Sequence, residues 1–216
     1  MNALFGLWQT DGAPVDPARV SRMTDSLNFW GTEPPALWRD NSLALGCQPG
    51  PADPPNAAQP AHHPASDLTL MASARLIHRG ELAAALSIPP ADLPAYSDGQ
   101  LLLTAWQRWG IDCVHHLNGD WHFALWDGAA RRLFLARDQH GTSSLYYHRG
   151  NDLFAFASTQ KPLLALPSLP QQPNLARIAQ MLNGVMGDGR LHQPLAPRPL
   201  AAAGRGRAAG QPLLVS

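Results

Sequence analysis

Short apolar runs separated by turn-forming residues dominate the second half of the chain. Four such runs occupy residues 117–127, 132–136, 145–148 and 153–158. Asn-Gly and Asp-Gly dipeptides flank the first run, and aromatic and branched residues fill it, which is typical of a β-strand. The Gly-containing turn of residues 127–130 favours an antiparallel hairpin between the first two runs. The four runs predict a meander that forms the central antiparallel sheet of an α+β domain.

The first half of the chain combines predicted strands with predicted helices. In the first predicted helix, Val20, Met23 and Leu27 recur at intervals of three and four residues, so one face is expected to be buried. Asp16 is placed to cap this helix, with Pro17 at its first position. The strands are expected at residues 1–8, 41–47 and 68–77, and the helices at residues 17–27, 79–86 and 100–109.

Composition and charge exclude several classes of function. Lys plus Arg equals Asp plus Glu at 16 each, so the balanced charge predicts neither a nucleic-acid partner nor an acidic membrane partner. The longest apolar runs are far below the ~18 residues of a transmembrane helix, and the N-terminus does not resemble a signal peptide. Cys47 and Cys113 stand far apart, which indicates two reduced, buried thiols in a cytoplasmic protein. The adjacent pairs His62–His63 and His115–His116 do not have metal-site spacing, so no metal site is expected.

The string LNGDWHFALWD…RLFLARDQHGTSSLYYHRGNDLFAFAS at residues 117–158 resembles a known family. It is similar to the second half of the class II glutamine amidotransferase domain that opens asparagine synthetases and their relatives, including the cyclases that close lasso peptides. The resemblance implies an α+β fold, the four-layer α/β/β/α sandwich of N-terminal-nucleophile hydrolases, with antiparallel sheets. It also implies a domain over residues 1–165 and a linker helix within residues 166–188.

The resemblance places the family's nucleophile at position 2, where this chain has Asn2. In the family an N-terminal Cys attacks the glutamine carboxamide and its own α-amine acts as the base. A carboxamide is no nucleophile, and we expect the bulky Asn2 to leave Met1 in place, which moves the α-amine away. No catalytic residue is therefore predicted, because Asn2 occupies the nucleophile position.

The resemblance also places the family's glutamine-binding groups, and most have no counterpart. The family's Arg clamp for the α-carboxylate would follow residue 47, but no basic residue lies between Arg39 and Arg75. The family's oxyanion-hole Asn-Gly corresponds to His78–Arg79 or its neighbours. Asp98 matches the acidic residue that binds the α-ammonium of glutamine, and the alternative is that Asp98 caps the following helix. Asp98 is thus the one predicted, vestigial substrate-binding residue.

The end of the chain differs in composition from the rest. Residues 189–216 contain Arg among Ala, Pro and Gly with no acidic or aromatic residue after position 189, which predicts a disordered tail. The family's ATP-binding S-G-G-x-D-S loop does not occur. We expect a truncated or frame-shifted end, so that ATP and Mg²⁺ belong only to the missing synthetase domain and this chain needs no cofactor.

Three functional hypotheses follow. The first is an asparagine synthetase-like protein whose glutaminase-like domain is inactive and works with a synthetase domain, as in lasso-peptide cyclases. The second is a glutaminase with an unorthodox nucleophile, either Cys47 or a Ser. The third is a non-enzymatic scaffold that docks a partner such as a leader or precursor peptide. A homodimer is compatible with each of them.

Overall fold

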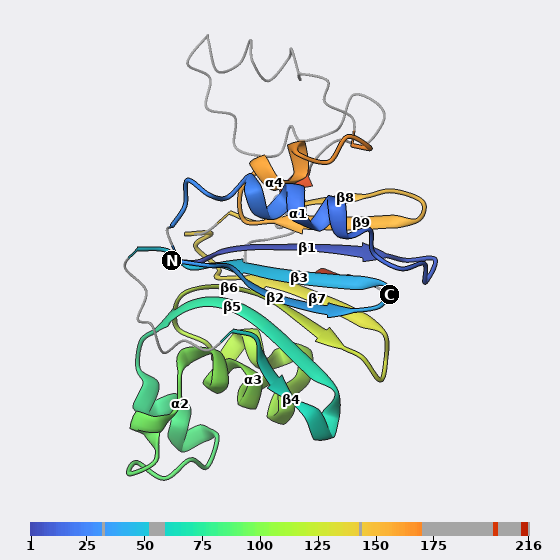
Figure 1. The fold of residues 1–216 in the computed structure, drawn as a ribbon. Helices are drawn as coiled ribbons and strands as arrows, with labels where there is room; N and C mark the ends of the chain where they lie inside the picture. The colour runs from blue at the N-terminus through green and yellow to red at the C-terminus, as the bar shows by residue number, and fades with distance from the viewer. Residues whose placement is uncertain (32, 52–58, 143, 170–200, 203–212, 216) are drawn as a thin grey trace.

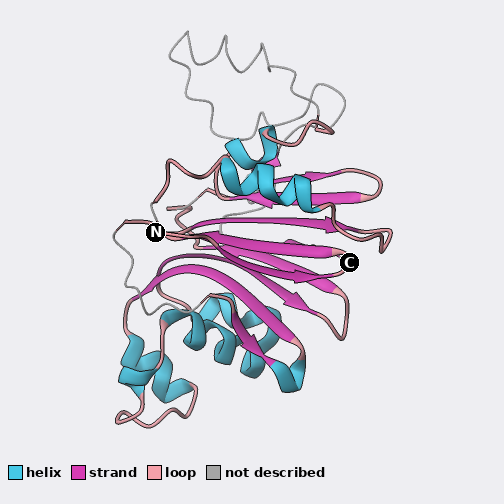
Figure 2. Ribbon diagram, viewed as in Figure 1, coloured by secondary structure: helices cyan, strands magenta, loops and turns pink. Residues whose placement is uncertain are grey.

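Two antiparallel β-sheets lie face to face between two layers of helices (Figure 1). In this computed structural model, residues 1–31, 33–51, 59–142, 144–169, 201–202 and 213–215 are described. The helices α1 (Pro17–Asp25) and α4 (Lys161–Leu164) cover one sheet, and α2 (Arg79–Ala85) and α3 (Asp98–Trp109) cover the other (Figure 2). The arrangement confirms the predicted four-layer α+β sandwich.

The six-stranded sheet has the order β10-β8-β9-β1-β3-β2. The first strand of the chain lies inside this sheet, because β1 pairs with β3 on one side and with β9 on the other. The bounds are β1 Ala3–Gln9, β2 Ala36–Asp40, β3 Leu43–Gln48, β8 Tyr146–Arg149, β9 Leu153–Ala157 and β10 Ala201–Ala202.

The five-stranded sheet has the order β11-β7-β6-β5-β4. Its long central pair, β5 and β6, is in register from Leu68 opposite Asp127 to Leu76 opposite Gly119. The bounds are β4 Ala61–His63, β5 Leu68–Leu76, β6 Gly119–Asp127, β7 Arg132–Arg137 and β11 Leu213–Val215, with short 3₁₀ turns at Pro64–Ser66, Leu93–Ala95 and Gly110–His116.

The predicted four-strand meander is wrong, although all four strands exist. β6 and β7 form a hairpin in the five-stranded sheet, whereas β8 and β9 form a hairpin in the six-stranded sheet. The link between β7 and β8 carries the chain from the five-stranded sheet to the six-stranded sheet. It turns at Gly141, whose φ of +65° favours glycine, and Asp138 fixes the turn by accepting hydrogen bonds from the backbone N–H and the hydroxyl of Thr142.

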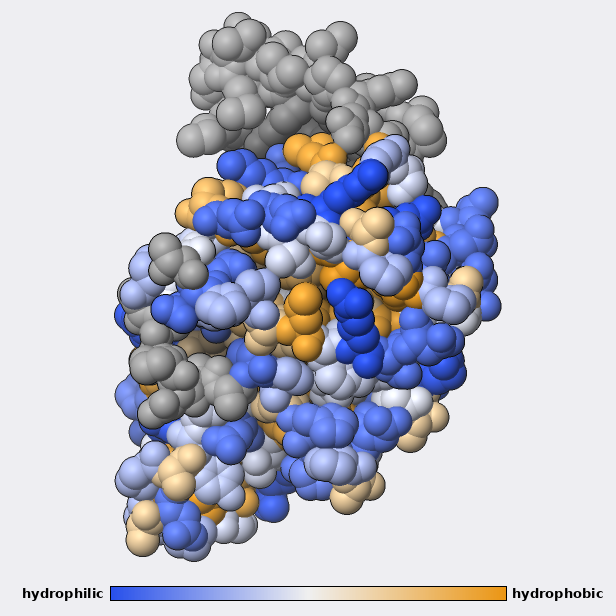
Figure 3. Space-filling view, viewed as in Figure 1, coloured by the Kyte–Doolittle hydropathy of each residue, from blue (hydrophilic) through white to orange (hydrophobic). Residues whose placement is uncertain are grey.

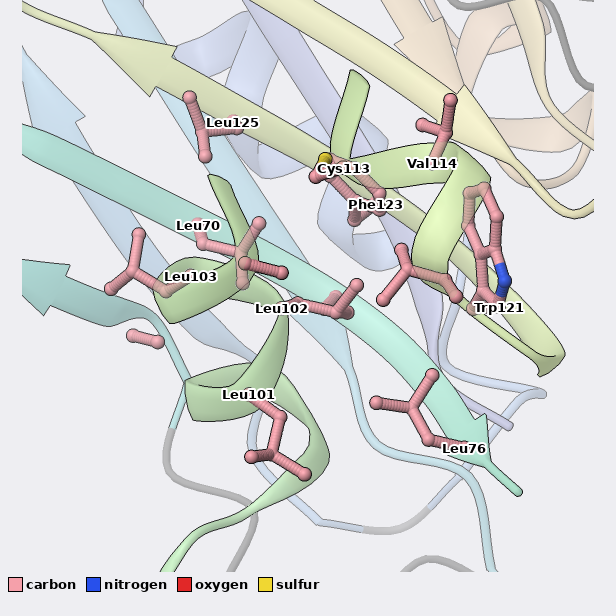
Figure 4. Close-up of a cluster of buried hydrophobic side chains, with 14 of the residues drawn as sticks. Leu70, Leu76, Leu101, Leu102, Leu103, Cys113, Val114, Trp121, Phe123 and Leu125 are labelled. Atoms are coloured by element: carbon pink, nitrogen blue, oxygen red, sulfur yellow. The ribbon is translucent and has the colours of Figure 1, made fainter. Parts of the chain in front are cut away.

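Three apolar clusters hold the four layers together. One lies between α2, α3 and the five-stranded sheet (Figure 4), and a second packs α1 and α4 on the six-stranded sheet. The third fills the space between the sheets, where Trp8 meets Trp126 edge-on with ring centroids 5.2 Å apart. Leu166 and Leu169 are buried in the second cluster, so packing continues past the predicted limit at residue 165.

Local sequence signals explain the helix ends. The Asp16 side chain accepts a hydrogen bond from the Ala18 N–H and Pro17 starts α1, as predicted. At α3 the N-cap is Ser97, which forms a capping box with Gln100, so the alternative that Asp98 caps this helix is wrong.

The five described residues of the predicted disordered tail lie in strands. Leu213, Leu214 and Val215 pair with β7, and Val215 is buried between the sheets. The prediction of disorder relied on the average composition of the segment, which is rich in Ala, Arg, Gly and Pro, and so missed the short apolar run at its end. The predicted linker helix lies outside the described residues.

Apolar side chains also reach the surface at separate points. On the face drawn in Figure 3, hydrophobic spots interrupt a mostly hydrophilic surface. Phe29, at 58% exposure, is the most exposed large hydrophobic residue in the described part of the chain, and the Lys161 ammonium lies 3.7 Å from its ring centroid. None of the described helices combines the length and apolar content that a membrane span requires.

Replacing Gly46 on β3 should destabilise the domain. A Cβ at this position would lie 2.1 Å from the buried ring of Phe5. Gly46→Ala should therefore lower the free energy of unfolding by about 1–3 kcal/mol, measured by urea denaturation. Gly80→Ala is the matched control, because a Cβ there meets nothing within 4 Å. Equal stability of the two variants would contradict the packing of Phe5 over Gly46.

Candidate functional site

Asn2 lies immediately before β1 and is only 6% exposed. Its backbone N–H donates to Ser73 Oγ at 2.8 Å, and its side-chain Nδ2 donates to the Ala72 carbonyl at 3.4 Å. The Gly50 N–H donates to Asn2 Oδ1 at 3.3 Å. Asn2 therefore ties the start of β1 to β5 and to the turn that follows β3.

At position 2 the side chain is a carboxamide whose polar atoms already form hydrogen bonds. Both polar atoms of the Asn2 side chain have partners, and neither is a nucleophile. With Met1 in place, the nitrogen of Asn2 is a peptide N–H and not an amine. The Met1 carbonyl accepts a hydrogen bond from Trp30 Nε1 at 3.0 Å, which orders the residue that precedes Asn2.

A row of polar residues faces Asn2 from the five-stranded sheet. Ser73 on β5 lies opposite His122 on β6, which lies opposite Arg137 on β7. The equivalent row two residues along these strands, formed by Met71, Ala124 and Leu135, is in the apolar cluster between the sheets. Because side chains two apart on a strand share a face, Ser73, His122 and Arg137 also face the other sheet. The inter-sheet core thus ends in a polar row beneath position 2.

His122 is the most perturbed titratable group of this row. Burial lowers the pKa of its imidazole from 6.5 to about 4. The nearby Asp138 carboxylate and the backbone of Asn2 oppose this shift, whereas the positive N-terminus reinforces it. His122 is therefore a neutral imidazole at pH 7.

Asp138 follows β7 and is 1% exposed. Its Oδ1 accepts two hydrogen bonds from Thr142, both at 3.2 Å, and its Oδ2 has no hydrogen-bond partner among the described residues. The carboxylate therefore stabilises the crossing to β8 and acts electrostatically on His122.

Asp98, the predicted substrate-binding residue, already has two partners. Its Oδ2 accepts a hydrogen bond from the Leu76 N–H at 2.9 Å. Its Oδ1 forms an ion pair with Arg79 Nε at 3.0 Å, with the N–H directed poorly for a hydrogen bond. The Asp98 carboxylate is thus already paired with a guanidinium, and its role in glutamine binding stays a prediction.

The residues predicted for the oxyanion hole differ from the β5 residue that contacts Asn2, and the position of an oxyanion hole stays a prediction. His78 precedes α2, and its side chain is 60% exposed beside Glu81. The β5 residue that contacts Asn2 is Ser73, five positions earlier. The strand register determines this neighbour, and a single sequence does not reveal it.

The other candidate reactive residues, two cysteines and a pair of adjacent histidines, lie at separate places in the described structure. Cys47 and Cys113 are buried and form no disulfide, as predicted, and burial raises the pKa of the Cys113 thiol to about 12. His62 contacts Thr69 and His63 contacts Ser66, each at a single ring nitrogen. Among the described residues, no group of three or more His, Cys, Asp or Glu is placed to hold a metal ion.

The buried imidazole should make the domain sensitive to acid. An unfolded histidine titrates near 6.5, so between that pH and about 4 the unfolded chain binds more protons than the folded one. The free energy of unfolding should therefore fall as the pH drops through this range, by on the order of 3 kcal/mol for His122 alone.

Urea denaturation at a series of pH values measures this effect. His122→Gln should flatten the pH dependence between about 6.5 and 4, whereas His115→Gln, at an exposed position, should leave it unchanged. The same pH dependence in His122→Gln as in the wild type would show that another group causes the acid sensitivity.

Comparisons with known proteins agree with this geometry. The family model of the glutamine amidotransferase domain matches residues 1–193. Asparagine synthetase [glutamine-hydrolyzing] 3 of Bacillus subtilis is 29% identical over 153 residues, which are 69% of this chain and 25% of that protein. A putative asparagine synthetase of Mycobacterium tuberculosis is 40% identical over 72 residues, which are 33% of this chain and 11% of that protein.

A solved structure confirms the fold. The glutamine phosphoribosylpyrophosphate amidotransferase of Bacillus subtilis superposes with a TM-score of 0.59 at 16% identity, over 76% of this chain and 43% of that one. This likeness establishes the N-terminal-nucleophile hydrolase sandwich, and the match to the curated asparagine synthetase spans a quarter of that protein's length. The fold, the family model and the relatives together show that this chain belongs to the glutamine amidotransferase domain family, in its asparagine synthetase-like branch.

Proposed function

We propose that this domain does not hydrolyse glutamine and acts as the silent amidotransferase-like part of an ATP-dependent, amide-forming system. The proposal rests on one observation, the way in which the structure holds the Asn2 side chain. Its side chain is buried, hydrogen-bonded at both polar atoms, and chemically inert as a nucleophile. Position 2 thus joins strands rather than attacking a substrate.

The surrounding groups support the same conclusion. No Lys or Arg occurs between Arg39 and Arg75, so that segment supplies neither a guanidinium nor an ammonium group for the α-carboxylate. Asp98 is paired with Arg79, which competes with an α-ammonium. Cys47, one of the alternative nucleophiles, is fully buried in the apolar cluster between the sheets.

The partner proposed for this domain is a synthetase domain that binds ATP and Mg²⁺. Two curated relatives are named as glutamine-hydrolysing asparagine synthetases, and the match covers 25% and 18% of their lengths. A silent domain of this kind, as in lasso-peptide cyclases, would contribute contacts to the synthetase or to its peptide substrate.

Ammonia release from glutamine tests the proposal. The wild type should release none above background, measured by a coupled glutamate dehydrogenase assay. Asn2→Cys should remain at background as well, because a thiol alone does not hold the α-carboxylate of the substrate.

Two outcomes separate the parts of this account. Activity in Asn2→Cys but not in the wild type would show that residue 2 alone silences the site and that glutamine still binds. Ammonia release by the wild type, lost in Cys47→Ala and kept in Cys113→Ala, would overturn the proposal in favour of an unorthodox nucleophile.

A further inference from the structure

The strand β4 ends before it covers the full length of β5. It pairs with β5 only between Leu68 and Leu70, so Ala72, two residues further along β5, lies beyond the end of this pairing. Ala72 is 2% exposed, and buried backbone N–H and C=O groups need hydrogen-bond partners. The backbone of Ala72 therefore requires a partner other than β4 on this side of the strand.

A side chain supplies this partner. The Ala72 N–H donates to Gln59 Oε1 at 3.1 Å, and Gln59 Nε2 donates to the Ala72 carbonyl at 3.0 Å. A primary carboxamide carries an acceptor oxygen and a donor NH2 group side by side, so it satisfies both backbone groups at once. The backbone of Ala72 thus binds a carboxamide in the way that it would bind a neighbouring strand.

The Gln59 carboxamide lies beside the two positions that the family resemblance assigns to the nucleophile and to substrate binding. Asn2 Nδ2 donates to the same Ala72 carbonyl, at 3.4 Å. In addition, a Cβ at Gly99, the residue after Asp98, would lie 3.7 Å from Gln59 Nε2. The side chain of a glutamine residue of this chain therefore fills space next to position 2.

We propose that the Ala72 backbone forms a binding site for a primary carboxamide and that Gln59 occupies it as an internal ligand, in place of a free amide such as the side chain of glutamine. The inference rests on the proposed function, because it names what fills the silent site. Gln59 is joined to the site by the chain, so its effective concentration exceeds that of a dilute free amide. A free amide therefore does not displace it from the wild type.

The two hydrogen bonds determine the class of ligand. A carboxylate has acceptor oxygens but no proton to donate to the Ala72 carbonyl, and an ammonium group has no acceptor for the Ala72 N–H. Gln59 is half-buried, so shortening its side chain leaves the site open to solvent. The site then accepts a small neutral amide and rejects the corresponding acid.

A purely structural role of Gln59 makes a different prediction. In that case the carboxamide only extends the pairing between β4 and β5, and water replaces it when the side chain is shortened. An added amide would then have no saturable effect on Ala72. Binding of an added amide separates the two roles.

Acetamide is the probe, because it has the Cγ and carboxamide atoms that Gln59→Ala removes. The isotope-labelled full chain is titrated with acetamide, and the backbone N–H resonance of Ala72 is followed by NMR. In Gln59→Ala this resonance should move saturably, with the weak, millimolar Kd expected of a ligand of about four non-hydrogen atoms. It should not move with acetate in this variant, nor with acetamide in the wild type.

Gln107→Ala, at an exposed glutamine on α3, is the matched control and should behave as the wild type does. A folded Gln59→Ala whose Ala72 resonance ignores acetamide, or responds equally to acetate, would overturn the inference. If Gln59→Ala does not fold, Gln59→Ser is titrated in the same way. The wild type gives an independent measurement, because nuclear Overhauser contacts must join the Gln59 carboxamide protons to both Asn2 and Gly99. Absence of these contacts would also overturn the inference.

The ammonia assay separates this inference from the proposed function. Acetamide binding by Gln59→Ala, without ammonia release from glutamine, supports both. A folded Gln59→Ala that neither binds acetamide nor releases ammonia overturns only the internal ligand, whereas ammonia release by the wild type overturns the proposed function.

Discussion

The packing of the two sheets against each other determines everything else in this domain. Met71, Ala124 and Leu135 from one sheet, and Leu4 and Trp8 from the other, form part of a single apolar cluster. Burial of such side chains is the main favourable contribution to folding. Where that cluster ends, the strand register replaces apolar residues with Ser73, His122 and Arg137. The candidate site is thus the polar edge of the core, and its groups are positioned by the core.

Asn2 is the connection across this edge. Its hydrogen bonds reach β5 and the turn after β3, so position 2 contributes to the seating of β1 between β3 and β9. A nucleophile in this place would need an open side chain and a free amine. In this chain the side chain at position 2 is instead held by hydrogen bonds to β5 and to the turn after β3.

The sequence predicted most of the strands and the main helices, because alternation, caps and glycines act locally, but it missed β2, β4 and β11. The four layers were predicted from the resemblance to the family. The sequence did not predict how the strands are distributed between the sheets, since β7 and β8 are separated only by a short turn whose direction depends on Asp138 and Gly141. The inert position 2 followed from the identity of Asn2. The neighbour of Asn2 on β5, the ion pair of Asp98 and the buried His122 did not follow, because each depends on strand register or on packing between distant segments.

The central claim proposed for this domain is that it does not hydrolyse glutamine, and the most direct physical reason for that would be that it does not bind glutamine. Isothermal titration of the wild-type chain with glutamine measures this most directly. The account predicts no saturable heat, because the Asp98 carboxylate is paired with Arg79 and the carboxylate clamp is missing. Saturable binding that is lost in Asp98→Asn would contradict it and would show that glutamine displaces the guanidinium.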